Sequence, residues 1–126
     1  MYKNKKKKEN NINFKLFLSL ANTCIDIVSN SSYVTVGEPI HLICRIRAIK
    51  NSNEVNLHVE WKRNDKLLPK NRNDITTNYS SINGILYGIL VIKHANQTDT
   101  GIYQCQYGPL LTATFQIIVN QCKSFL

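Results

Sequence analysis

The sequence predicts an all-β protein that folds as a sandwich of two antiparallel sheets. Apolar and polar residues alternate over short stretches such as Ile40–Arg47, which is the period of a strand with one buried face. Turn signals such as Gly37-Glu38-Pro39 and Asn83-Gly84 separate these stretches. The sequence lacks the repeat of an amphipathic helix. These observations favour strands whose apolar faces pack against one another.

The size and charge of the chain restrict its class. Its 126 residues leave room for one domain of about 100 residues plus short ends. Hydrophobic residues make up 43% of the sequence, which is normal for a globular core. The formal net charge is +8, but six lysines and one glutamate before residue 24 account for five of these charges. The residues from 24 onward carry the remaining three positive charges, which is too weakly basic to indicate a nucleic-acid partner.

The first 23 residues look like a targeting segment. A basic run, Lys5–Lys8, precedes the apolar stretch Leu16–Ala21, whose small residues suit a cleavage point. This order is typical of a secretory signal peptide, and a disordered basic segment is the alternative. The apolar stretch is too short for a transmembrane helix, so we expect no membrane insertion. We expect a domain over residues 24–121 and a short tail over 122–126.

The strands of this domain are expected where β-branched, aromatic or alternating residues gather. They are Ile25–Val28, Tyr33–Val36, Ile40–Arg47, 57–61, 66–68, Ile75–Tyr79, 86–92, Ile102–Tyr107 and 113–119. In the third of these, Ile40, Leu42, Cys44 and Ile46 share the inward face. A polar loop over 48–56 follows it.

A motif near the end of the chain organises the core. Residues 99–105 read D-x-G-x-Y-x-C, in which Tyr103 and Cys105 share one face of a strand. Asp99 can tie down the preceding turn, and Gly101 can adopt backbone angles that other residues avoid. A second cysteine on a facing strand, with a large ring beside the bridge, would complete a sandwich core. Cys44 and Trp61 are suited to these two roles.

This set of residues resembles the signature of the immunoglobulin superfamily over roughly residues 30–120. The resemblance implies a Greek-key sandwich with an inter-sheet disulfide from Cys44 to Cys105, with Trp61 packed beside it and Tyr103 as the tyrosine corner. It also implies an ion pair between Asp99 and Arg72. Only 44 residues separate Trp61 from Cys105, and the last strand lacks a G-x-G bulge. The chain therefore looks closest to the I-set domains of adhesion molecules and receptors.

Two further cysteines, Cys24 and Cys122, have no implied partner. Four cysteines allow three full pairings, and no C-x-x-C pair or histidine cluster indicates zinc. In the immunoglobulin-like fold the first and last strands run parallel, which places the two ends of the domain at opposite poles. Cys24 and Cys122 would then pair only if residues 24–32 folded back along the domain. Otherwise each is a free thiol or forms an intermolecular disulfide.

The sequence shows no catalytic set, no metal site and no cofactor motif. His41, His58 and His94 have no nucleophile at motif spacing. Three N-glycosylation sequons begin at Asn30, Asn78 and Asn96. We therefore expect a binding module and not an enzyme.

The expected binding surface is the outward face of the strands around Trp61, Tyr103 and residues 113–119. Its residues are His58, Glu60, Lys62, Gln104, Gln106, Gln116 and Ile118, with Leu110 in the adjoining loop. Neutral amides suit an interface, because burying unpaired charge is costly.

The function implied by the resemblance is extracellular protein–protein binding, in cell adhesion or receptor-type recognition. The partner would be a protein at the cell surface or in the matrix, reached by a secreted chain or an ectodomain. One alternative is a structural module of a giant intracellular muscle-type protein. Another is a heparin-binding matrix domain with a basic surface composed of Arg45, Arg47, Lys50, Lys62 and Arg63.

Overall fold

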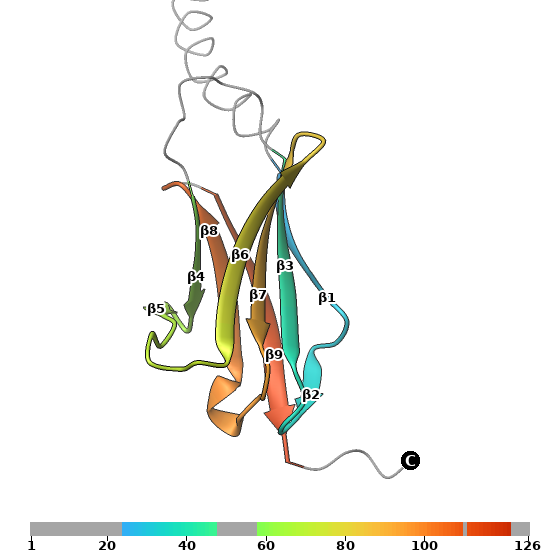
Figure 1. The fold of residues 1–126 in the computed structure, drawn as a ribbon, viewed down its shortest axis with the longest axis vertical. Helices are drawn as coiled ribbons and strands as arrows, with labels where there is room; N and C mark the ends of the chain where they lie inside the picture. Colours follow the sequence, from blue (N-terminus) through green and yellow to red (C-terminus); the bar gives the residue numbers. More distant parts are fainter. Residues whose placement is uncertain (1–23, 48–57, 110, 122–126) are drawn as a thin grey trace, which may run out of the picture.

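The computed structural model describes residues 24–47, 58–109 and 111–121, which form two β-sheets packed face to face (Figure 1). The four-stranded sheet has the order β1-β3-β7-β6, and the five-stranded sheet has the order β2-β9-β8-β4-β5. The strands are β1 (Cys24–Ser29), β2 (Tyr33–Thr35), β3 (Ile40–Arg47), β4 (Val59–Arg63), β5 (Lys66–Leu67), β6 (Ile75–Ile82), β7 (Ile85–Ile92), β8 (Gly101–Tyr107) and β9 (Leu111–Asn120). A short 3-10 helix, η1 (Gln97–Asp99), precedes β8.

The chain changes sheets between its first two strands. β1 pairs antiparallel with β3, so that Cys24 lies opposite Arg47. β2 pairs parallel with β9, so that Thr35 lies opposite Asn120. As a result, β1 begins at one end of the sandwich and β9 finishes at the other (Figure 1).

The core lies between the sheets and is built from alternate residues of five strands. β3 contributes four buried side chains, and β4, β7, β8 and β9 contribute two each. These side chains are Ile40, Leu42, Cys44, Ile46, Val59, Trp61, Leu90, Ile92, Tyr103, Cys105, Ile117 and Val119. The disulfide between Cys44 and Cys105 crosses this core with its Cα atoms 6.3 Å apart. Trp61 is the Cα partner of Cys105 and is 4% exposed, so the predicted disulfide with Trp61 packed beside it is confirmed.

A buried carboxylate fixes the corner before β8. Asp99 is fully buried and accepts hydrogen bonds from Arg72, from Arg63 Nη1 at 3.0 Å and from the Asn96 backbone N–H at 2.8 Å. The Tyr103 hydroxyl donates to the Asp99 carbonyl at 2.6 Å, which is the tyrosine corner. Burial raises the pKa of Tyr103, so the hydroxyl stays a donor. The pairing of Arg72 with Asp99 is confirmed, and the role of Arg63 was not predicted.

Gly101 is needed for space and not for its backbone angles. Its φ is not positive, so the prediction of unusual angles is wrong; the positive-φ glycines in the described residues are Gly37, Gly84 and Gly108. A Cβ at Gly101 would lie 2.8 Å from the side-chain atoms of Asn64. The Asn64 side chain sits there because its Oδ1 accepts from the Ile102 N–H at 2.9 Å.

Most strands lie where the alternation predicts them. The strand expected over 57–61 begins at Val59, while β6 continues to Ile82 and β9 starts at Leu111. The Asn83-Gly84 turn joins β6 to β7 with φ values of 52° and 78°, as a two-residue hairpin requires. The expected segment 1–23, the loop over 48–56 and the tail over 122–126 lie outside the described residues.

We predict that Gly88→Ala destabilises the sandwich. A Cβ at Gly88 would lie 2.8 Å from Cγ1 of Val59, a buried side chain of the facing sheet. Overpacking of this kind costs about 1–3 kcal/mol, which lowers the melting temperature by several degrees. Thermal unfolding followed by circular dichroism measures the change. Thr76→Ala on exposed β6 is the control and should stay within about 0.5 kcal/mol; equal melting temperatures for both variants would contradict the packing argument.

Acid should destabilise the protein partly through Asp74. Arg72 donates to both oxygens of Asp74, at 3.0 and 2.8 Å, and these bonds lower the pKa of that carboxyl group from 3.8. Because the folded pKa lies below the unfolded one, this stabilisation is complete above the unfolded value and is lost as the pH falls through the folded value. Melting temperatures between about pH 6 and pH 2 should therefore fall less steeply for Asp74→Asn than for the wild type. Equal slopes for Asp74→Asn and the wild type would contradict this prediction.

Candidate partner-binding face

The outward side chains of β4, β8 and β9 form one surface, which we call the amide face. Cross-strand partners share a face, and the register places Glu60 opposite Gln106, Lys62 opposite Gln104, and Ile102 opposite Gln116. The structure therefore brings together Glu60, Lys62, Gln104, Gln106 and Gln116, as predicted. His58 is exposed just before β4, and Leu110 lies outside the described residues.

The two central glutamines of the amide face differ in their contacts. Gln106 accepts from Lys62 Nζ at 3.3 Å and donates to the Gly108 carbonyl at 3.1 Å, which holds its amide in one orientation. Lys62 also lies 3.6 Å from Glu60, which balances the two charges on this face. Gln104 is half-buried and makes no side-chain hydrogen bond within the part of the chain that the structure describes. Its amide can therefore offer donors and an acceptor to another molecule.

Exposed apolar side chains border the amides on this face. Leu67 of β5 is opposite Lys62 and is 58% exposed, while Ile102 is 51% exposed. Tyr33 of β2 is opposite Ile118 and is 63% exposed. The sequence predicted Ile118, which is half-buried, as part of this face, but it did not predict Leu67, Ile102 or Tyr33. The signal for Ile102 was present, because it alternates with inward-facing Tyr103; Leu67 and Tyr33 needed the strand pairing.

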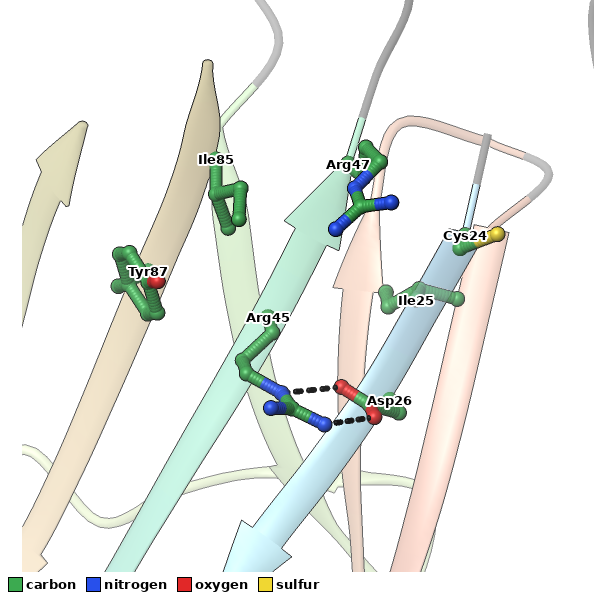
Figure 2. A pocket seen from close by; sticks show the side chains of 7 residues that line it. All are labelled: Cys24, Ile25, Asp26, Arg45, Arg47, Ile85 and Tyr87. Atoms are coloured by element: carbon green, nitrogen blue, oxygen red, sulfur yellow. Dashed lines mark hydrogen bonds and ion pairs between the residues drawn. The ribbon is translucent and has the colours of Figure 1, made fainter. Parts of the chain in front are cut away.

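The basic residues expected to form a heparin surface do not form one. Arg45 and Arg47 lie on β3 of the four-stranded sheet, whereas Lys62 and Arg63 lie on β4 of the other sheet. Arg45 is bonded to Asp26 through Nε at 2.9 Å and through Nη2, and these bonds lower the pKa of Asp26 (Figure 2). Arg63 is bonded to Asp99. Lys50 lies outside the described residues.

The remaining predicted residues that the structure describes lie on the surface. The sequon residues Asn30, Asn78 and Asn96 are exposed. Asn96 caps η1, with its Oδ1 accepting from the Gln97 N–H at 2.8 Å. Cys24 is exposed and unbonded, at the end of the sandwich opposite Asn120, and Cys122 lies outside the described residues.

The described ranges contain neither a metal-binding cluster nor a membrane-spanning helix. No group of three His, Cys, Asp or Glu side chains there is placed to hold a metal ion. Nor do residues 24–47, 58–109 and 111–121 contain a helix with the length and hydropathy of a membrane span.

Solved structures with the same fold include partner-bound molecules. The Ig1-Ig2 portion of Dpr2, in complex with DIP-Theta, has a TM-score of 0.66 and 20% identity, over 78% of this chain and 50% of that one. Dpr11 IG1, bound to DIP-gamma, has a TM-score of 0.54 and 24% identity, over 71% and 99% of the two chains. The BTLA ectodomain has a TM-score of 0.57 and 19% identity, over 78% and 98%. Identities this low show a shared fold alone.

Sequence comparisons agree with the fold. Titin of Drosophila melanogaster is 34% identical over 98 residues, which is 76% of this chain and rounds to 0% of that very long protein. A family model described as an immunoglobulin domain matches residues 25–108, about two thirds of the chain. The chain is a member of the immunoglobulin superfamily.

Proposed function

We propose that this chain is an extracellular recognition module, without catalytic activity, that binds a protein partner through the amide face. The observation that carries the proposal is the composition of that face. The amide of Gln104 makes no hydrogen bond within the described residues, and exposed Ile102 is the next outward residue on its strand. Exposed Leu67 lies beyond Lys62 on one side of the face, and exposed Tyr33 lies beyond β9 on the other. The partner would be a protein at the cell surface or in the matrix.

Physical chemistry favours this face for a protein partner. Burying a neutral amide that gains a hydrogen bond costs little, whereas burying an unpaired charge costs several kcal/mol. The two charged side chains of the face, Lys62 and Glu60, already offset each other. Apolar side chains such as Ile102 and Tyr33 then supply the contact area that stabilises a complex.

The comparisons support the proposal only in general terms. Dpr2 is described in complex with DIP-Theta, so this fold is able to hold a protein partner. The I-set subtype, the secretory role of residues 1–23 and the use of the three sequons remain parts of the proposal.

We predict that the double substitution Gln104→Glu and Gln106→Glu abolishes partner binding without unfolding the domain. Both side chains point outward, so the free energy of unfolding should change by no more than about 1 kcal/mol, the contribution of the lost hydrogen bond from Gln106 to the Gly108 carbonyl. Lys62 and Glu60 offset each other on this face, so two further carboxylates would leave it with an excess of negative charge, and affinity should fall at least about tenfold. The probe is a panel of purified extracellular immunoglobulin-domain proteins, including this chain itself, tested by surface plasmon resonance.

The matched control places two glutamates on the other sheet. Thr76 and His41 are both exposed and flank Val91 on the outward face of the four-stranded sheet. The variant His41→Glu with Thr76→Glu should keep wild-type affinity. If the glutamine variant keeps it too, the binding site lies elsewhere on the domain.

A structural module of a giant intracellular protein is the second candidate, and the match to titin favours it. The disulfide between Cys44 and Cys105 opposes it, because such bridges persist in oxidising compartments.

The state of the thiols separates the two candidates. We expect protein isolated from its natural source, and alkylated before lysis, to carry the Cys44–Cys105 linkage in its peptide map. The same map shows whether Cys24 or Cys122 is linked to another chain. Four alkylated thiols in the native protein would refute the extracellular function.

A further inference from the structure

The sequon at Asn78 lies within β6 and faces the outside of the four-stranded sheet. Its middle residue, Tyr79, points toward the other sheet, because the Tyr79 hydroxyl donates to the Val59 carbonyl at 2.7 Å. Side chains alternate along a strand, so Asn78 and Ser80 both point outward. The register confirms this arrangement, with Asn78 opposite Ile89 and Ser80 opposite Tyr87.

The surface in front of Asn78 is unusually apolar for an outward face. The row that begins at Asn78 continues across the sheet through Ile89 and Ile43 to Val28, which is 39% exposed. Ile82, on the same strand as Asn78, is 56% exposed. A sheet face of this kind is normally covered by another element or by a binding partner.

A shallow pocket lies beside this apolar row. It has a volume of about 310 Å³, with Tyr87 and Ile85 of β7 on one side and Asp26, Arg45 and Arg47 on the other (Figure 2). Arg45 is held in place by its two bonds to Asp26. This pairing leaves Nη1 of Arg45 and the second lone pair of each Asp26 oxygen available to a ligand. An aromatic ring beside fixed donors and acceptors suits a sugar, which has an apolar ring face and polar hydroxyl and acetamide groups.

Asn78 is close enough to deliver such a sugar. Tyr87 is the diagonal cross-strand neighbour of Asn78, and such neighbours lie about 7–8 Å apart. The first sugars of a glycan on Asn78 would therefore reach Ile89 and Tyr87. Tethering also gives the sugar an effective concentration in the millimolar range, so that weak contacts suffice. Asn30 and Asn96 differ, because neither lies within a strand of this sheet.

We propose that Asn78 carries an N-linked glycan whose first sugars lie on Ile89 and Tyr87 and cover the outward face of the four-stranded sheet. The inference rests on the proposed function, since the modification requires the secretory pathway. It deepens that function: with this face covered by carbohydrate, the amide face of the other sheet is the one left for a protein partner.

The test uses the full chain secreted from a eukaryotic cell line. Glycopeptide mass spectrometry should find Asn78 occupied. In Asn78→Gln, binding of a hydrophobic fluorescent dye should rise about twofold or more, because the apolar row becomes exposed. Tyr87→Ser, which keeps the sequon, should raise dye binding and also increase the mobility of the glycan's N-acetyl groups in NMR spectra. Thr98→Ala cancels the sequon at Asn96 but keeps the Asn96 cap of η1, and it should leave dye binding unchanged.

Enzymatic removal of the glycan from the folded wild-type protein should raise dye binding as Asn78→Gln does. This treatment leaves the folding of the chain unaffected, because the glycan is present until the protein has folded. A secreted protein with Asn78 unmodified would overturn the inference while leaving the proposed function intact. So would an occupied Asn78 whose removal leaves dye binding at the wild-type level. Retention of the chain in the cytosol with all four thiols free would instead overturn the proposed function.

Discussion

The buried carboxylate of Asp99 joins parts of the chain that have little else in common. Its oxygens accept hydrogen bonds from Arg63 of β4, from Arg72 between β5 and β6, and from the backbone N–H of Asn96. The backbone carbonyl of Asp99 accepts from the hydroxyl of Tyr103. A carboxylate without exposure to water is tolerated only when it is compensated in this way. The network therefore sets where η1 ends and where β8 begins.

The start of β8 decides which of its side chains face outward. Because side chains alternate, a slip of one residue would send Tyr103 and Cys105 to the surface and bury Gln104 and Gln106. The amide face thus exists because the Asp99 corner and the disulfide hold β8 in one register. The site depends on buried residues that no partner touches.

The alternation of the sequence predicted the strands and the core well, because burial on one face leaves a period of two that survives in a single chain. It predicted less of the surface. Glu60, Lys62 and Gln106 were assigned to one face correctly, but Leu67 and Tyr33 join that face only through pairing of distant strands. Arg63 is a charged residue at the end of β4, and nothing local shows that it reaches Asp99. Gly101 was expected at the start of β8 for its backbone angles, but it is needed there because a Cβ would meet the side chain of Asn64. The sequence could not show this contact, because Asn64 lies 37 positions earlier.

The pairing of the first two strands has a mechanical consequence. β1 begins at one end of the sandwich and is the edge strand of its sheet, as β2 is of the other sheet. β9 runs parallel to β2 and finishes at the end of the sandwich opposite the start of β1 (Figure 1). Tension applied between Cys24 and Asn120 would act along these strands, at right angles to their hydrogen bonds. The bonds from Val36 to Asn120 and from Ile118 to Ser32 would then be loaded in shear together with the ladder between β1 and β3. Bonds loaded together resist more force than bonds peeled one after another, so we expect the domain to resist tension between these two ends more strongly than tension across its sheets.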